Sequence, residues 1–256
     1  MNIITLNTWG GRAGKEGLLA FFEKYRDEAD VFCLQEMWSA PYLMFEGRTG
    51  GGKSVTDENI MVYGLQEITA LLPEFDRYFV PYLLDDYGVA LFVRKSIIVV
   101  EDGEEWVHFH KGYVPSEGEI GNHARALQYV TLKLDERDIT ILNLHGLWNG
   151  KGKGDDDDRL RQSEKITAFI KSLGHPVVLC GDLNLLPDTE SIKMLEDAGL
   201  RNLIKEYGIT STRTSHYAKP EKYADYVFVS DSIEVKDFRV LPEEVSDHAA
   251  LLVEIL

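Results

Sequence analysis

Short apolar runs recur along the chain and are bounded by polar or turn-forming residues. Such runs predict buried β-strands. They lie at Ile3–Asn7, Val31–Gln35, Val89–Arg94, Leu127–Leu134, Ile139–Leu144, Val177–Cys180, Tyr226–Val229 and Ala250–Ile255. Several of them follow one another without an intervening helical segment, so antiparallel neighbours are expected beside any crossover units.

Other segments space their apolar residues for one face of a helix. They lie at Gly17–Arg26, Asn59–Leu71, Asp158–Ser172 and Thr189–Ala198. Asp188, which follows Pro187, is the predicted N-cap of the last helix. Three long or Gly-rich segments are predicted loops: Ser39–Glu58, Gly103–His123 and Leu147–Asp157. Loops of this length are often functional.

The order of elements predicts a mixed α/β protein. No internal repeat or linker is visible, so residues 1–256 are expected to form a single domain. Two β-sheets packed face to face with helices outside would fit the pattern, and an ordinary three-layer sheet stays open at this point.

The net charge of the chain limits the partners that we expect. The net charge is −16, from 27 basic and 43 acidic residues, and such a surface repels polyanions. The chain has no apolar stretch of membrane-spanning length, and its N-terminus begins directly on a strand pattern. We therefore expect a cytoplasmic protein with no membrane partner. The sequence leaves its oligomeric state open, with a monomer as the expectation. Cys33 and Cys180, each in a predicted buried strand, are expected to be reduced core thiols.

Polar residues stand at the ends of many of these apolar strands. They are Asn7, Glu36, Asn143, His145, Asp182, Asn184, Asp225, Asp247 and His248. Any one of them has a plain explanation, because Asp and Asn often cap backbone groups in turns. Together they supply oxygen ligands suited to Mg²⁺ or Mn²⁺ and imidazoles that can contact phosphate or move a proton. The absence of thiolate ligands argues against zinc.

The short motifs LNTW, LQE, NLHG, GDLN, ADY and SDH occur in an order that resembles the endonuclease/exonuclease/phosphatase superfamily of metal-dependent phosphoesterases. The resemblance runs from Asn7 to His248, nearly the whole chain. It implies a four-layer α/β/β/α sandwich of two packed mixed β-sheets flanked by helices. It also implies hydrolysis of phosphoester bonds with Mg²⁺ or Mn²⁺.

The resemblance also implies a role for each matching residue. Glu36 resembles the principal metal ligand, with Asn7 and Asp247 as further ligands. Asp182 would orient or deprotonate the attacking water, and Asn184 would hold the scissile phosphate. His248, oriented by Asp225, would act as general base or stabilise the pentacovalent phosphate. His145 resembles the histidine that contacts phosphate or the leaving oxygen.

Weaker candidates surround this set. Arg125 and Asn143 are candidate substrate-binding residues, although Arg125 can be a surface residue and a strand-end Asn often bonds only backbone. His108, His110 and His123 are taken as loop histidines. Trp9, Trp38 and Trp148 follow motif residues and are candidates to line the cleft, although aromatic residues near strand ends more often belong to the core.

Two rival functions are considered. The segment GRTGGGKS, Gly47 to Ser54, matches the P-loop pattern of NTPases. Pro41 interrupts the strand that a P-loop requires before it, and the helix that should begin at Lys53-Ser54 has better caps further on. We therefore expect a Gly-rich loop beside the cleft. A binding module without activity is the second rival, and the complete acidic set argues against it.

Substrate is the least constrained feature. The residues after GDLN and around ADY depart from the inositol-polyphosphate phosphatases, and NLHG departs from the abasic-site endonucleases. A nuclease acting on DNA or RNA ends or single strands is the favoured interpretation. A phosphatase or phosphodiesterase acting on a small nucleotide or other phosphoester is the alternative.

Overall fold

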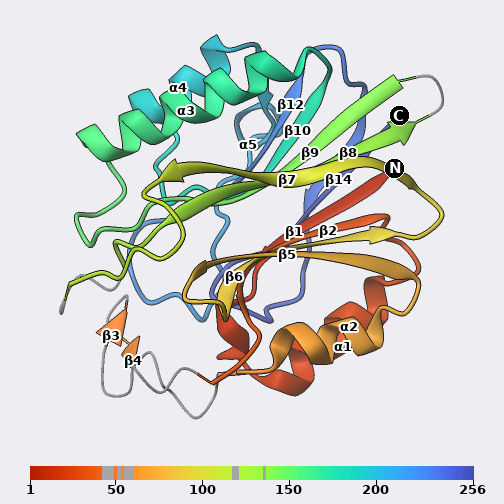
Figure 1. Ribbon diagram of the computed structural model, residues 1–256, viewed down its shortest axis with the longest axis vertical. Coiled ribbons are helices and arrows are strands. Elements are labelled where there is room, and N and C mark those ends of the chain that lie inside the picture. Colours follow the sequence, from red (N-terminus) through yellow and green to blue (C-terminus); the bar gives the residue numbers. More distant parts are fainter. Residues whose placement is uncertain (42–48, 51–52, 55–59, 117–120, 135–136) are drawn as a thin grey trace.

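Two six-stranded mixed sheets pack face to face in the computed structural model (Figure 1). The structure describes residues 1–41, 49–50, 53–54, 60–116, 121–134 and 137–256. Sheet I contains, in spatial order, β13 (Val235–Val240), β14 (Leu251–Ile255), β1 (Asn2–Asn7), β2 (Val31–Trp38), β6 (Tyr87–Arg94) and β5 (Phe75–Leu83). Sheet II contains β11 (Leu200–Asn202), β12 (Asp225–Ser230), β10 (Val177–Asp182), β9 (Arg137–His145), β8 (Arg125–Leu134) and β7 (Ile98–His108).

Helices cover the outer face of each sheet, which completes four layers (Figure 1). Sheet I is covered by α1 (Lys15–Tyr25) and α2 (Gly64–Leu71), and sheet II by α3 (Asp157–Leu173) and α4 (Glu190–Asp197). The short elements are the 3-10 turn η1 (Trp9–Gly11), α5 (Leu203–Glu206) and the paired strands β3 (Thr49–Gly50) and β4 (Lys53–Ser54). The predicted α/β/β/α sandwich is therefore confirmed.

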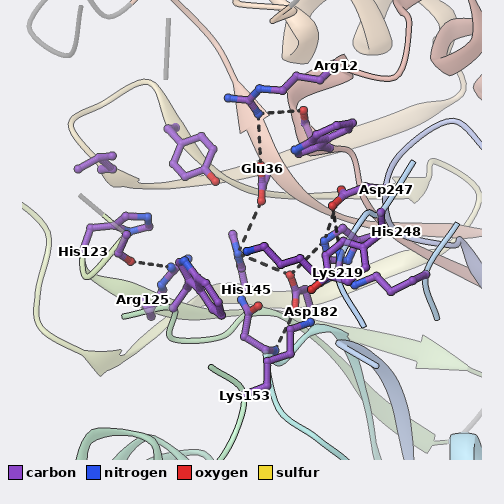
Figure 2. A pocket seen from close by; sticks show the side chains of 18 of the residues that line it. Arg12, Glu36, His123, Arg125, His145, Lys153, Asp182, Lys219, Asp247 and His248 are labelled. Atoms are coloured by element: carbon purple, nitrogen blue, oxygen red, sulfur yellow. Dashed lines mark hydrogen bonds and ion pairs between the residues drawn. The ribbon is translucent and has the colours of Figure 1, made fainter. Parts of the chain in front are cut away.

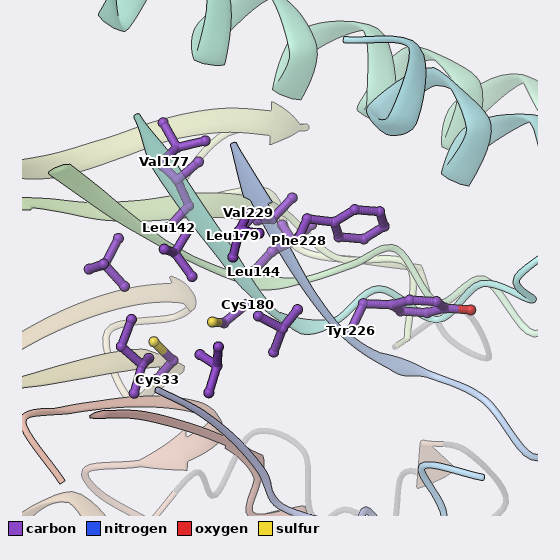
Figure 3. Close-up of a cluster of buried hydrophobic side chains, with 14 of the residues drawn as sticks. Cys33, Leu142, Leu144, Val177, Leu179, Cys180, Tyr226, Phe228 and Val229 are labelled. Atoms are coloured by element: carbon purple, nitrogen blue, oxygen red, sulfur yellow. The ribbon is translucent and has the colours of Figure 1, made fainter. Parts of the chain in front are cut away.

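Central strands are apolar throughout because both of their faces are buried. In β2, Val31 and Cys33 point into the layer between the sheets, whereas Phe32 and Leu34 pack under α1 and α2. Side chains alternate across a strand, so one apolar run supplies two cores. Cys33 and Cys180 lie in the inter-sheet core as free, buried thiols, as expected (Figure 3).

The predicted strands all exist, and the differences lie mainly at sheet edges. β5, β7, β11 and β13 were not predicted, and residues 103–108 of the expected loop belong to β7. Edge strand β7 is largely solvent-exposed and polar, so it lacks the apolar signal of a buried strand. In β5, Pro81 obscured the pattern.

The helices were predicted with two errors. α2 begins at Gly64 rather than Asn59, and Ile60 to Tyr63 are not helical. The N-cap of α4 is Thr189, whose hydroxyl accepts from the Ile192 amide, and not Asp188. Among the described residues, no helix is both long and apolar enough to cross a membrane.

The P-loop alternative receives no support. Lys53 and Ser54 lie in β4, paired with Thr49 and Gly50, and not at the start of a helix. The rest of that segment, 47–48 and 51–52, lies outside the described residues, as does most of the expected loop Ser39–Glu58.

Candidate active site

Strand register brings the motif residues together at one end of the sandwich. In sheet II, Asp182 at the end of β10 pairs with His145 of β9 on one side and with Asp225 of β12 on the other. In sheet I, Asn7 ends β1 beside the end of β2, which carries Glu36. The two groups meet across the sandwich, because the Asn7 Nδ2 atom donates to Asp182 Oδ2 at 3.0 Å.

Backbone geometry at this edge is unusual at two of the predicted residues. Glu36 and Asn184 both adopt the left-handed conformation, with φ of 57° and 54°. Glu36 lies where β2 loses register with β6, and such a bulge re-aims a side chain. Left-handed backbone is uncommon for non-glycine residues and is concentrated at functional sites, so both side chains are held in place at a cost in stability.

Gly181, which precedes Asp182 in β10, allows this strand to approach β9 closely. Its φ is 136°, and a Cβ at this position would lie 2.0 Å from the Leu144 carbonyl oxygen. Any other residue would push β10 away from β9 and displace Asp182 from His145.

The Glu36 and Asp182 carboxylates are held close together by Asn7. Its amide nitrogen donates to Glu36 Oε1 at 3.1 Å as well as to Asp182, while its oxygen accepts from the Trp9 amide. Burial raises the pKa of Glu36, and the Arg12 guanidinium 3.8 Å away opposes this shift. Asn7 therefore positions two carboxylates, and its direct contact with a metal stays a prediction.

His248 is fixed by Asp225. The Nδ1 atom lies 2.8 and 2.9 Å from the two Asp225 oxygens, and both side chains are buried. Burial raises the pKa of Asp225 to about 7, and in its ionised form this carboxylate only accepts, so Nδ1 of the neutral imidazole then carries the proton and Nε2 has the lone pair. That Nε2 atom lies 3.6 Å from Asp182 Oδ2 and 3.7 Å from Asp247 Oδ1. Burial lowers the pKa of His248, so its imidazole is neutral and can accept a proton.

The second imidazole of the site, that of His145, is in contact with Tyr82. The Tyr82 hydroxyl lies 2.8 Å from His145 Nδ1, and burial raises the pKa of this phenol, so it stays protonated and can donate. Donation to Nδ1 leaves the proton of a neutral His145 on Nε2, which lies 3.8 Å from Asp182 Oδ2 and 4.0 Å from Glu36 Oε1. Asp182 thus lies between two imidazoles, that of His145 and that of His248 (Figure 2).

Residues 4–248 match the model of the endonuclease/exonuclease/phosphatase family. The chain belongs to this family. Its fold is similar to that of a mannosyl-6-phosphatase from Bacteroides thetaiotaomicron, with a TM-score of 0.72, 20% identity, and 100% of this chain and 99% of that chain covered. D. rerio TDP2 in complex with a single-strand DNA product gives a TM-score of 0.67 at 16% identity, with 99% and 97% covered. No curated protein sequence matches this chain.

The site can hold a metal ion, as expected for an endonuclease/exonuclease/phosphatase protein. Ligand atoms of Asp182, Asp225 and His248 lie within 4.8 Å of one another, and all three residues are buried. Asp225, however, is engaged by His248 and does not line the pocket, whereas Glu36, Asp182 and Asp247 do. Asp247 Oδ1 is buried without a hydrogen-bond partner. This carboxylate set, with an unsatisfied oxygen, fits a hard divalent cation.

The remaining predicted residues divide between the pocket and the core. Asn184 lines the pocket, and its backbone N–H donates to Asp182 Oδ1 at 2.8 Å. Arg125 also lines it, fully buried, with Nε and Nη1 lacking partners. Asn143 does not reach the pocket. It accepts from Gln35 at 2.7 Å and donates to Leu34, Ala90 and Gln128 between the sheets, so its assignment to substrate is corrected to a structural role.

Sequence reasoning missed several residues in and behind the pocket. Tyr82, which contacts His145 from behind the pocket, lies on an unpredicted strand. His123, treated as a loop residue, lines the pocket and is buried, with its ring centre 5.1 Å from that of Tyr82. Lys153 lies in a loop, and Arg213 forms only an isolated β-bridge with His248, so in the sequence their basic character was the one signal of a role. Trp9, Trp38 and Trp148 do line the pocket, as considered from their positions after the motifs.

Proposed function

We propose that this protein is a Mg²⁺- or Mn²⁺-dependent phosphoesterase that takes a small phosphoester, or the end of a nucleic-acid strand, into a compact pocket. One observation carries the proposal. The acidic cluster and both imidazoles lie in a cavity of about 180 Å³ whose walls carry aromatic and cationic side chains. Pockets of this kind enclose small ligands, whereas duplex DNA needs an extended basic surface.

Local charge supports an anionic substrate despite the acidic surface. Among the described residues that line the pocket, the cations are Arg12, Arg125, Lys153, Arg213 and Lys219, and the carboxylates are Glu36, Asp182 and Asp247. Cations therefore outnumber acids here in a chain of net charge −16. A bound divalent cation would add further positive charge and supply Lewis-acid stabilisation of the phosphate oxygens.

The chain's own residues account for the proton movements. Hydrolysis forms a bond from water oxygen to phosphorus and breaks the bond to the leaving oxygen. Asp182 orients the water, His248 Nε2 accepts its proton, and Asp225 stabilises the resulting imidazolium. His145 Nε2–H donates to the leaving oxygen or to a phosphate oxygen. Arg125 and Asn184 hold the scissile phosphate, and Glu36 and Asp247 hold the metal.

A substrate panel tests the proposal. Purified protein is assayed with Mg²⁺ or Mn²⁺ against sugar phosphates, nucleotides, single-stranded oligonucleotides, tyrosyl-DNA and plasmid. Asp182→Asn serves as the inactive control, because it keeps the shape and removes the charge. We expect metal-dependent turnover of compact phosphoesters or strand ends that is lost in the control. Turnover that persists without metal, or in Asp182→Asn, would contradict the proposal.

Nucleic-acid ends are the second candidate substrate. Trp9, Trp38 and Trp148 line the pocket, and indole rings stack on unpaired bases. D. rerio TDP2, similar in fold, has been seen with a single-strand DNA product. Preference for single-stranded oligonucleotides over sugar phosphates in the same panel would select this candidate.

A further inference from the structure

Two kinds of cation line the pocket, and only some have a carboxylate partner. Arg12 lies 3.8 Å from Glu36, and Arg213 lies 3.2 Å from Asp247. Arg125, Lys153 and Lys219 form no ion pair with any residue that the structure describes. Arg125 and Lys153 are buried, whereas Lys219 is exposed. A buried cation without an anion is costly, so an anionic ligand beside Arg125 or Lys153 would offset that cost.

These unpaired cations lie on different walls (Figure 2). Arg125 lies 5.6 Å from the centre of the Tyr82 ring, on the His145 side of Asp182. Lys153 donates to the Tyr223 carbonyl, two residues before Asp225, which borders Asp182 on its other side. The proposed function uses Arg125 for the scissile phosphate. Lys153 and Lys219 are then left without a role in it.

Lys153 is held rigidly although its loop is rich in glycine. Its carbonyl accepts from the Leu186 amide at 2.9 Å, and its Nζ donates to the Tyr223 carbonyl at 2.8 Å. The Arg159 guanidinium donates to the neighbouring carbonyls of Gly152 and Gly154. The side chain is 4% exposed, and the ammonium group has donors to spare beyond the one bond to Tyr223. Such preorganisation is typical of a binding group rather than a solvated lysine.

Aromatic rings accompany these lysines. Lys153 Nζ lies 5.6 Å from the centre of the Tyr217 ring, and Lys219 Nζ lies 5.5 Å from that of Trp148. Arg213 covers Tyr217 at 4.0 Å. Rings and cations together suit a ligand that combines a flat or cyclic body with an acidic group.

We propose that Lys153 and Lys219, with Tyr217 and Trp148, form a subsite for a second anionic group of a small substrate. The inference rests on the proposed function, because it assumes that a phosphoester occupies the neighbouring centre. It narrows the substrate to a compact phosphoester that carries another phosphate or a carboxylate, such as a sugar or nucleoside bisphosphate. Burial lowers the pKa of Lys153 to about 8, so its ammonium group remains charged at neutral pH.

Matched substrates test the subsite. The probes are glucose monophosphate with glucose bisphosphate, adenosine monophosphate with adenosine bisphosphate, and phosphoglycerate as the carboxylate arm, all with Mg²⁺. We expect wild-type kcat/KM to favour the doubly anionic member of each pair. Lys153→Gln and Lys219→Ala should each reduce that preference by about ten- to hundredfold, as expected for a lost charge-assisted contact. Lys153→Arg should restore most of it.

Nearby exposed lysines provide matched controls. Lys151→Ala and Lys222→Ala remove the same charge from the same two segments but lie outside the pocket, so the preference should stay unchanged. Equal losses on both members of a pair would overturn the subsite while leaving the phosphoesterase intact.

Binding separates failure of the subsite from failure of the proposed function. Calorimetry with His248→Ala protein measures affinity for each member of a pair without turnover. The subsite is supported if the bisphosphate binds more tightly than the monophosphate and this difference is lost when Lys153 is replaced. This result supports the subsite even if the wild-type protein hydrolyses none of the probes. Equal affinity for both members overturns it.

Discussion

Replacing His248 and Asp225 singly and together tests whether they act as one unit. His248→Ala removes the imidazole, and Asp225→Asn keeps the size of the orienting side chain but removes its charge. The two are joined by contacts of 2.8 and 2.9 Å in a buried environment, and Asp225 does not itself line the pocket. We therefore expect Asp225 to act only through His248.

The expected losses follow from these contacts. A positioned general base contributes about 10²–10⁴-fold to the rate. A buried hydrogen bond to a charged group contributes about 1.5–3 kcal/mol, and each ~1.4 kcal/mol is tenfold. Asp225→Asn should thus lower kcat/KM by about ten- to hundredfold and His248→Ala by about a thousandfold. The double variant should match His248→Ala alone, because an orienting group has no effect once its partner is gone.

The assay is a double-mutant cycle on kcat/KM, with Mg²⁺ affinity measured for each variant by calorimetry. The proximity of Asp182, Asp225 and His248 also allows a direct metal site. In that arrangement Asp225→Asn would weaken Mg²⁺ binding, whereas an orienting Asp225 leaves it nearly unchanged. Losses that multiply in the double variant, or weakened metal binding in Asp225→Asn, would refute the reasoning.

Four further outcomes are expected. Activity falls on acidification with a midpoint below pH 6.5, because the base must be neutral and burial lowers the pKa of His248 from that ordinary value; the pH profile of kcat/KM measures this. Glu36→Gln removes most activity and weakens Mg²⁺ binding in calorimetry, and unchanged affinity would exclude Glu36 as a ligand. Asn143→Ala lowers the free energy of unfolding by about 3 kcal/mol in urea titrations but spares KM, since it loses only inter-sheet hydrogen bonds. Short oligonucleotides compete well with plasmid per bond near physiological salt, and tight, salt-resistant duplex binding without Mg²⁺ would contradict this.

The sequence predicted which residues gather at the centre of the site because these residues stand at the ends of neighbouring strands. Asp182, His145 and Asp225 end neighbouring strands, and once those strands are aligned the residues must meet. Apolar runs also identified every central strand, since burial on both faces leaves a continuous signal. The same signal fails at edges, so β5 was missed, and Tyr82 with it.

The pocket walls could not be predicted because they depend on loops that meet only after folding. Lys153 and Arg213 are far apart in sequence, yet both contact the Tyr217 ring. Asn143 shows the opposite error. It lies before the end of β9, and its amide is bonded by Gln35 from the facing sheet and by Gln128 from the neighbouring strand β8, as well as by two carbonyls of the facing sheet. Only the arrangement of facing sheets distinguishes a buried amide that binds substrate from one that joins two layers.

Several features of the site oppose stability, and this explains why the sequence revealed it. Burial raises the pKa of Glu36, Asp225 and Asp247, so each is costly to keep ionised in the folded protein. Glu36 and Asn184 add left-handed backbone at the same edge. Folding alone favours none of these choices. Their coincidence at one end of the sandwich favours a ligand that offsets the cost, and the metal and phosphate ester of the proposed function would have the charges to do so.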